Sequence, residues 1–183
     1  MNSTLHSIIK AANFAAEKHR DQRRKDPQKT PYINHPIGVA HILCDEGSVG
    51  DGDVLQAAIL HDTVEDTNTS FEELEKNFGK KVRDIVAEVT DDKSLNRIER
   101  KKAQISRAKD ACHEAKLVKL ADKLYNLRDI KRVAPVGWSK KDVDDYFTFS
   151  KSVLDEIRGT NESLENALDD IIKNHFSHSH AKI

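Results

Sequence analysis

The stretch "AAILHDTVED" ends a run of apolar residues with one histidine and three carboxylates. Asp62, Glu65 and Asp66 follow the spacing i, i+3 and i+4, which makes them neighbours on the surface of a helix. Their repulsion, near the negative end of the predicted helix, would cost on the order of 1–2 kcal/mol. A bound cation would offset that cost, and His61 adds an imidazole ligand one turn before Glu65. The stretch therefore predicts a metal site, although a solvated acidic helix end fits it equally well.

A second candidate acid is Asp122, in the stretch "AKLVKLADKLYNLRDI". It falls between an apolar stripe and a lysine-marked face of the predicted helix, with Asn126 one turn later on nearly the same line. An acid at the edge of a core helix needs a partner, because an unpaired buried charge is costly. A metal ion would serve, but this segment alone slightly favours an ordinary salt bridge. The stripe is Leu117, Leu120, Ala121, Leu124 and Leu127, and the predicted solvent face carries Lys116, Lys119 and Lys123.

The third candidate is His35, in "PYINHP". It stands between a loop and a predicted helix whose first turn contains Pro36, which is a fixed position suitable for a ligand. Taken alone, a histidine before proline is more often a structural hydrogen-bonding residue. Only in combination with the other two segments does His35 become a candidate ligand.

Helical periodicity runs through almost the whole chain, and no stretch alternates as a strand would. The spacing therefore predicts an all-α helical bundle in a single domain. Helices are expected over 4–20, from Pro36 to 44, from a cap at Asp53 to about 67–68, over 71–78, and around 81–90, 113–130, 139–157 and 161–175. A capping box formed by Ser70 and Glu73 should start the fourth helix, and Gly79 should end it. We expect the domain to cover 1–174 and a flexible, histidine-containing tail to follow over 175–183.

Composition excludes several classes of partner. The chain has 183 residues, with 30 basic and 31 acidic side chains, so no overall positive field draws it to nucleic acid or to an anionic membrane. No apolar run approaches the ~18 residues that span a bilayer, and the N-terminus lacks the apolar region of a signal peptide. Cys44 and Cys112 are far apart in sequence and are expected to be reduced and buried. A cytoplasmic protein is the expectation.

Together the three segments read H…HD…D, and on these residues the chain resembles the HD-domain phosphohydrolases. More narrowly, it is similar to the hydrolase domain of the RelA/SpoT proteins and to their small stand-alone animal relatives, the metazoan SpoT homologs. The similarity covers nearly the whole chain, and "HDTVEDT" followed by "KLADKLYNLRD" is its most specific part. The other matching stretches are "RRKD…TPYINHPIGVAHIL", "FGKKVRDIVAEVTDDKSL" and "GWS…DYF".

The resemblance implies one Mn²⁺ ion whose ligands are His35, His61, Asp62 and Asp122. Imidazole and carboxylate donors would also suit zinc or iron, so the donor types alone do not select the metal. A two-metal site would need further histidines between the HD pair and the distal aspartate, where the chain offers only His113. One metal ion is therefore favoured.

The resemblance also suggests which residues act on the substrate. Glu65 and Asp66 match the catalytic acidic pair, which would orient a water, take its proton and deliver one to the leaving oxygen. Acids this close favour a proton on one of them near neutral pH. The predicted substrate-binding residues are Arg24, Lys25 and Arg97 for phosphates, Asn126 for the substrate or the water, and Tyr146, for which stacking on a base and packing in the core are equally good accounts.

The activity implied by the resemblance is hydrolysis of guanosine 3′,5′-bis(diphosphate) to GDP and pyrophosphate. The alternatives are an NADPH 2′-phosphatase, another HD-type nucleotide phosphohydrolase acting on deoxynucleotides, and a sensor that binds nucleotide without catalysis. In each case the partner is a small-molecule nucleotide, with no nucleic acid and no membrane. The sequence leaves the oligomeric state open.

Overall fold

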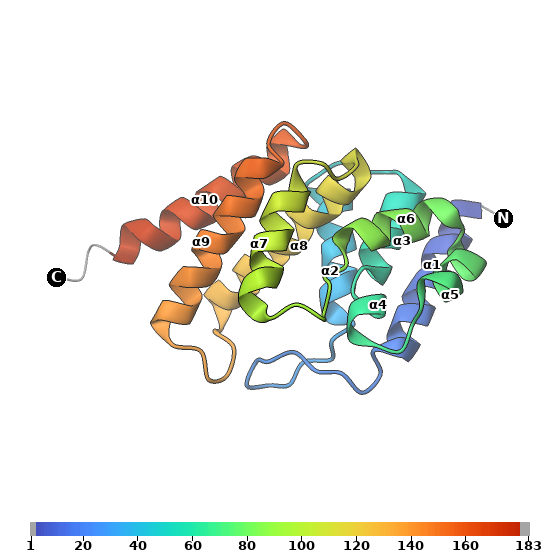
Figure 1. The fold of residues 1–183 in the computed structure, drawn as a ribbon, viewed down its shortest axis with the longest axis horizontal. Coiled ribbons are helices and arrows are strands. Elements are labelled where there is room, and N and C mark those ends of the chain that lie inside the picture. The colour runs from blue at the N-terminus through green and yellow to red at the C-terminus, as the bar shows by residue number, and fades with distance from the viewer. Residues whose placement is uncertain (1–2, 180–183) are drawn as a thin grey trace.

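The computed structural model of the chain describes residues 3–179, which form a bundle of helices without a strand (Figure 1). Within this range, Arg23 and Pro31 form an isolated antiparallel backbone bridge. The prediction of an all-α, single-domain fold is confirmed. The helices are α1 (Ser3–Lys18), α2 (Asn34–Asp45), α3 (Gly52–Leu60), α4 (Thr63–Asp66), α5 (Phe71–Phe78), α6 (Lys80–Val89), α7 (Arg97–Ala108), α8 (His113–Arg132), α9 (Lys140–Glu156) and α10 (Glu162–Ser179).

Helix α8 is the central element. It packs against α2, α3, α6, α9 and α10, and Figure 1 shows α9 and α10 at one end of the molecule with α1 and α5 at the other. The predicted apolar stripe of α8 is buried, and Leu120, Leu124 and Leu127 are fully enclosed. The predicted solvent face is wrong at Lys123, which is only 8% exposed. Its surroundings belong to the site described below.

The stretch that contains His61 and Asp62 is not continuous helix. We expected one helix to stop near 67–68, but α3 ends at Leu60 and the short α4 begins at Thr63. The Thr63 hydroxyl donates to the Leu60 carbonyl at 2.7 Å, which gives a terminal carbonyl of α3 a partner. The two residues therefore occupy a turn, and the predicted dipole penalty at the end of one long helix does not arise. This turn aims both side chains at α8.

Helix boundaries elsewhere follow the predictions with local exceptions. Gly79 ends α5 with φ +89°, as expected. Ser70 caps α5 by accepting from the Glu73 N–H, but the Glu73 carboxylate pairs with Lys18, so only half of the predicted capping box forms. Asp51 caps α3 in place of the predicted Asp53.

Helix α7 was not predicted. Its signal is a capping box, in which Asn96 accepts from the Glu99 N–H and the Glu99 carboxylate accepts from the Asn96 N–H. The segment is so rich in basic residues that we took it only as a source of cations. It nevertheless forms a helix that packs against α9.

Two further expectations change at the surface. Helix α10 continues to Ser179, and His175 stacks on Phe147 with ring centroids 3.8 Å apart, so the expected flexible tail does not begin at 175. The end of that predicted tail, 180–183, lies outside the described residues.

Cys44 is exposed and Cys112 is half-buried, which corrects the expectation that both are buried. Within the described range, no helix combines the length and apolar character needed to cross a membrane.

Close packing of α2 on α8 depends on Gly38. A Cβ at this position would lie 2.0 Å from Cε2 of Tyr125, whose ring also contacts His35. We expect Gly38→Ala to lower the free energy of unfolding by about 1–3 kcal/mol, because overpacking forces the two helices apart. Urea denaturation measures this change. Gly50→Ala is the matched control, since a Cβ there meets nothing within 4 Å, and an equal loss in both variants would contradict the packing argument.

Candidate active site

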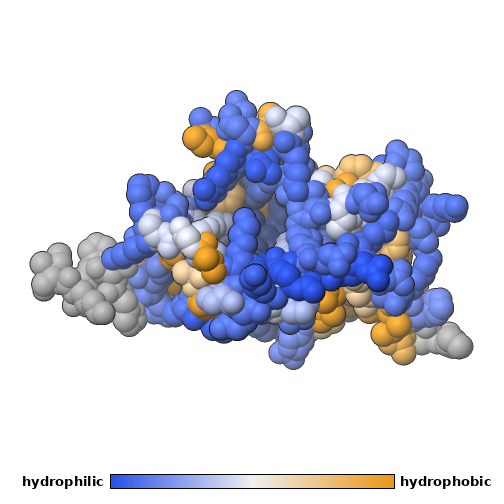
Figure 2. Space-filling model, turned by 90° about the horizontal axis from the view of Figure 1, so that it is seen from below, coloured by the Kyte–Doolittle hydropathy of each residue, from blue (hydrophilic) through white to orange (hydrophobic). Residues whose placement is uncertain are grey.

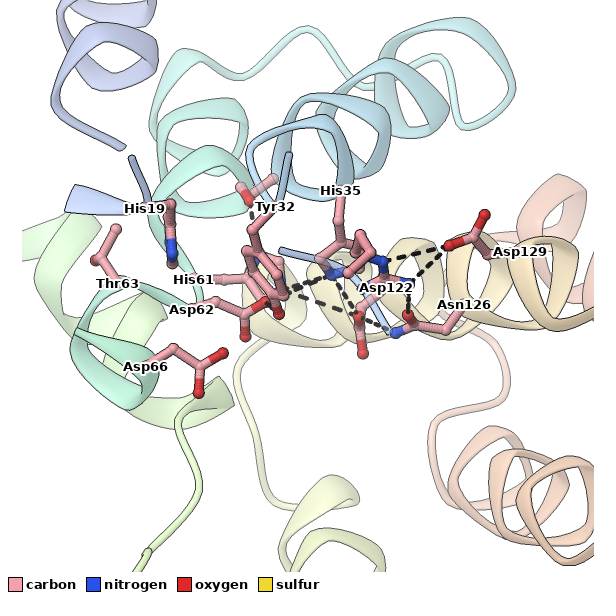
Figure 3. A network of polar contacts seen from close by, with 12 residues as sticks. His19, Tyr32, His35, His61, Asp62, Thr63, Asp66, Asp122, Asn126 and Asp129 are labelled. Carbon is pink, nitrogen blue, oxygen red and sulfur yellow. Dashed lines mark hydrogen bonds and ion pairs between the residues drawn. The ribbon is translucent and has the colours of Figure 1, made fainter. Parts of the chain in front are cut away.

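Four of the predicted residues converge where α2, the α3–α4 turn and α8 meet (Figure 3). Nε2 of His35 and Nε2 of His61 are 3.3 Å apart. The Asp62 Oδ2 atom lies 3.0 Å from Nε2 of His61 and 3.4 Å from Nε2 of His35. Oδ1 of Asp122 lies 3.2 Å from Nε2 of His35 and 3.8 Å from Nε2 of His61. Three segments that are distant in sequence therefore bring their donor atoms to one point.

The donor atoms at this point fit a divalent metal ion. The Nδ1 atom of His61 lies 2.8 Å from the Ala58 carbonyl, which can only accept, so Nδ1 carries the proton and Nε2 is the nitrogen available as a ligand. Neighbouring ligands around an ion with bonds of about 2.1 Å lie about 3 Å apart, which is the spacing seen here. His35, His61 and Asp62 can thus hold a divalent metal. Asp122 as a fourth ligand remains a prediction that these distances support.

The pKa of His61 links metal binding to pH. Burial lowers the pKa of His61, but the carboxylates of Asp62 and Asp122 more than offset this and raise it to about 9. Burial likewise raises the pKa of Asp122, and the charges of Lys123 and His35 reverse the effect and hold it well below its ordinary value. Metal binding must displace the imidazolium proton, so metal affinity increases with pH.

A surrounding layer of hydrogen bonds orients the carboxylates. The Tyr32 hydroxyl donates to Oδ2 of Asp62 at 2.6 Å. The amide of Asn126 donates to Oδ1 of Asp122 at 2.6 Å, and Arg24 donates to the Asn126 amide oxygen at 2.9 Å. These contacts hold the two carboxylates in place before any ligand arrives.

Tyr32→Phe should weaken metal binding by roughly 10-fold or more, because an outer hydrogen bond to a ligand carboxylate is lost while the aromatic packing is kept. Titration of the metal-stripped protein with a divalent ion measures the dissociation constant. Tyr125→Phe is the control, because its ring also contacts His35 but, among the described residues, its hydroxyl has no hydrogen bond to the site. Unchanged affinity in Tyr32→Phe would remove Tyr32 from the metal site.

The two acids of the predicted catalytic pair occupy different surroundings. Glu65 lines the metal pocket, and its Oε2 accepts from the Asp91 N–H at 3.0 Å. Burial, with a smaller contribution from nearby carboxylates, raises the pKa of Glu65 to about 7. Asp66 instead lines the adjoining cavity, where Lys93 donates to it at 2.7 Å and Gln22 at 2.9 Å. Glu65 is therefore the acid that faces the four converging side chains.

The adjoining cavity contains most of the predicted substrate-binding residues, and we call it the nucleotide cavity after that prediction. Its volume is about 350 Å³, and Arg24, Lys25, Asn126 and Tyr146 line it, whereas Arg97 lies outside it at the exposed start of α7. Tyr32 and Asn126 line both this cavity and the metal pocket, so the two lie side by side. The surface on this side is largely hydrophilic and hollowed near its centre (Figure 2).

Within the nucleotide cavity, the predicted residues differ in how far they are already engaged. Arg24 donates to Asp129 as well as Asn126, so it is held in an ion pair. Lys25 is exposed. Tyr146 packs beside Trp138 with ring centroids 5.7 Å apart, so part of the cavity wall is aromatic.

The sequence reasoning missed several residues of the metal pocket, among them Tyr32, Lys119 and Lys123. Tyr32 was treated only as part of a loop, and Lys119 and Lys123 were assigned to the solvent face. Lys123 donates to Oδ2 of Asp122 at 3.0 Å, and Lys119 lines the pocket wall. The available signal was helical spacing, because these lysines precede and follow Asp122 at i−3 and i+1 and share its edge of α8.

Comparisons with known proteins agree with this geometry. A family profile described as "HD domain" matches residues 11–144. The guanosine-3′,5′-bis(diphosphate) 3′-pyrophosphohydrolase MESH1 of Xenopus tropicalis is 62% identical over 169 residues, which cover 92% of this chain and 94% of that protein. The protein of the same name from Homo sapiens is 56% identical over 173 residues, which cover 94% of this chain and 97% of that protein.

A solved structure supports the same relationship. It is described by the words "A metazoan ortholog of SpoT hydrolyzes ppGpp and plays a role in starvation responses". It is 52% identical to this chain and matches its fold with a TM-score of 0.90, covering 92% of this chain and 94% of the other. With the HD pair, the distal aspartate and the helical bundle all in place, the chain belongs to the HD-domain family and, within it, to the metazoan SpoT homologs.

Proposed function

We propose that this chain hydrolyses guanosine 3′,5′-bis(diphosphate) to GDP and pyrophosphate, using one Mn²⁺ ion held by His35, His61, Asp62 and Asp122. The observation that carries the proposal is the convergence of these donor atoms, with distances from 3.0 to 3.8 Å, in a pocket that also contains Glu65. The names of the relatives supply the substrate. Mixed nitrogen and oxygen donors suit Mn²⁺, and the assay below tests it against other ions.

The proposed reaction divides the work between the ion and the side chains. A bound divalent ion lowers the pKa of a water and stabilises charge on a phosphoryl oxygen. Glu65 takes the proton of the attacking water, for which a pKa of about 7 is well suited. The water oxygen bonds to the phosphorus attached to the 3′-oxygen, the bond from that phosphorus to the 3′-oxygen breaks, and Glu65 returns the proton to the 3′-oxygen. Pyrophosphate and GDP are the products.

The remaining predicted residues position the nucleotide. Asp66 is held by Lys93 and Gln22, so its proposed role is to orient the substrate or a water in the nucleotide cavity. Lys25 is the proposed phosphate contact there, and Tyr146, beside Trp138, offers a stacking surface for the base.

Two other residues take different proposed parts. Arg24 acts chiefly by holding Asn126 against Asp122, because its guanidinium is already paired. Arg97 is proposed to contact a phosphate from the exposed start of α7, outside the cavity wall.

The experiment compares candidate nucleotides side by side. Metal-stripped protein is incubated with guanosine 3′,5′-bis(diphosphate), NADPH or a deoxynucleoside triphosphate, each with no metal, Mn²⁺, Mg²⁺ or Zn²⁺, and phosphorus NMR identifies the products. The expected result is GDP and pyrophosphate from the guanosine compound, dependent on metal and fastest with Mn²⁺. Faster release of orthophosphate from NADPH would favour the 2′-phosphatase alternative. Binding without turnover would indicate a sensor.

A further inference from the structure

One edge of α8 faces the metal pocket and carries four polar residues at helical spacing: Lys119, Asp122, Lys123 and Asn126. Three of them are engaged with protein partners. Asp122 approaches His35, Lys123 donates to Asp122, and Asn126 accepts from Arg24. Lys119 is different, because its ammonium group has no hydrogen bond or ion pair with the residues that the structure describes. A cation on the wall of the pocket is thus left available.

Two acids whose charges act on Lys119, Asp91 and Glu88, form hydrogen bonds with other groups. The carboxylate of Asp91 accepts from the Gln104 amide at 2.6 Å, and that of Glu88 accepts from the Cys112 N–H at 2.6 Å. Burial, reinforced by the charge of Lys123, lowers the pKa of Lys119 to about 8. An ammonium group in such surroundings gains more from an anionic ligand than one that is already paired or fully hydrated.

Lys119 also stands where two cavities meet. It lines the metal pocket and a second cavity between α6, α7 and the start of α8, called here the α6–α7 cavity. Asp91 and Gln104 line both cavities as well, so the two cavities adjoin at these three residues. This direction is distinct from the nucleotide cavity, which joins the metal pocket at Tyr32 and Asn126.

The α6–α7 cavity has further basic groups. Arg100 and Arg107 line it, and within the described part of the chain neither guanidinium forms an ion pair, although several acids also contribute to the wall. A pyrophosphate group carries several negative charges on two linked phosphorus atoms. Its first phosphoryl group can sit at the metal pocket while the second extends toward Lys119.

We propose that Lys119 binds the distal phosphoryl group of the 3′-pyrophosphate, and then the departing pyrophosphate, at the entrance to the α6–α7 cavity. This inference rests on the proposed function for its substrate. It makes Lys119 a specificity-determining residue, because a substrate with a single phosphoryl group at the metal pocket does not reach it. The nucleotide cavity would hold the rest of the substrate in either case.

The test compares Lys119→Met with Lys116→Met, a lysine one turn earlier on α8 that lines neither cavity. The substrates are guanosine 3′,5′-bis(diphosphate) and guanosine 5′-diphosphate 3′-monophosphate, both with Mn²⁺. Lys119→Met should lower kcat/KM for the bis(diphosphate) by roughly 10- to 100-fold, as expected for one charge-assisted hydrogen bond, and change that for the monophosphate by less than about 3-fold. Lys116→Met should behave as the parent with both substrates.

A binding measurement gives an independent readout. Calorimetric titration of the Mn²⁺-loaded protein with inorganic pyrophosphate should show roughly 10-fold weaker binding in Lys119→Met, with orthophosphate binding unchanged. Lys119→Arg keeps the charge and should restore most of the pyrophosphate affinity, and circular dichroism verifies that each variant is folded.

The outcomes separate this inference from the proposed function. Equal losses with both substrates, or pyrophosphate binding at the parent level in Lys119→Met, would overturn the role given to Lys119. If the parent does not turn over the bis(diphosphate) but binds pyrophosphate through Lys119, the proposed function fails and the pyrophosphate site stands. If the parent turns over the bis(diphosphate) normally and Lys119→Met has no effect, the proposed function stands and the role given to Lys119 fails.

Discussion

Asp62→Ala should leave the protein unable to retain a divalent metal and should lower turnover by at least about 1000-fold. The reason is that Oδ2 of Asp62 contacts both imidazoles, at 3.0 Å from His61 and 3.4 Å from His35. Removing it deletes an anionic ligand and leaves the two histidines with no shared carboxylate on that side. Elemental analysis after dialysis measures the metal content, and product release measures turnover.

A readout without metal accompanies this prediction. In the stripped protein, Asp62 is a principal group that raises the pKa of His61 against the effect of burial. The pKa of His61 should therefore fall in Asp62→Ala, which NMR titration of the ring can follow. Asp45→Ala, at the exposed end of α2, is the control and should match the parent in metal content, in turnover and in the pKa of His61. Parent levels of metal in Asp62→Ala would show that the ligand set is wrong.

Glu65→Gln should keep the metal and lose most of the activity. Glu65 lines the metal pocket, and the amide oxygen of glutamine can still accept from the Asp91 N–H, so the local structure is preserved. Glutamine cannot take a proton from water, and the loss of general-base catalysis should reduce turnover by about 100- to 10,000-fold. Glu72→Gln, on the exposed side of α5, is the control. Turnover near the parent rate would exclude Glu65 as the base.

The same substitution should stabilise the metal-free protein at alkaline pH. The pKa of Glu65 in the folded protein is about 7, which is above the ~4.3 of an unfolded chain, so the folded state binds the proton more tightly. The free energy of unfolding therefore falls as pH rises from about 4.5 to 7 and is level above that. Glu65→Gln has no such carboxylate. Its free energy of unfolding should therefore exceed that of the parent by about 1–3 kcal/mol at pH 8 and differ little from it at pH 4.

Urea denaturation of the stripped proteins at the two pH values tests the sign. A gain that is equal at pH 4 and pH 8 would point to packing and not to the charge. Lower activity together with higher stability would identify Glu65 as a carboxylate kept in place for function, because the fold is more stable without its charge.

Local pattern predicted those parts of the fold that depend on neighbours in sequence. The stripe through Leu120 and Leu124 identified the core face of α8, and Gly79 marked the end of α5 because its backbone conformation favours glycine. The break at His61 was not predictable in this way, since the apolar periodicity of α3 runs up to it without interruption. The cap of α3 shifted to Asp51 for a similar reason, because two aspartates stand close together and only backbone geometry selects one.

The order of the residues along the chain was enough to predict the chemistry that this protein can offer, through His35, the HD pair and Asp122, and the family to which that order belongs. The packing of the helices was needed to show that their donor atoms meet within 4 Å, that Glu65 and Asp66 face different cavities, and that Lys119 has no ion-pair partner among the described residues. Spacing along a helix sets contacts within a turn or two, whereas the meeting of segments tens of residues apart depends on how α2 and α3 pack on α8. Burial and the neighbouring charges on that packed surface then set the pKa of each group, and neither can be read from a local pattern.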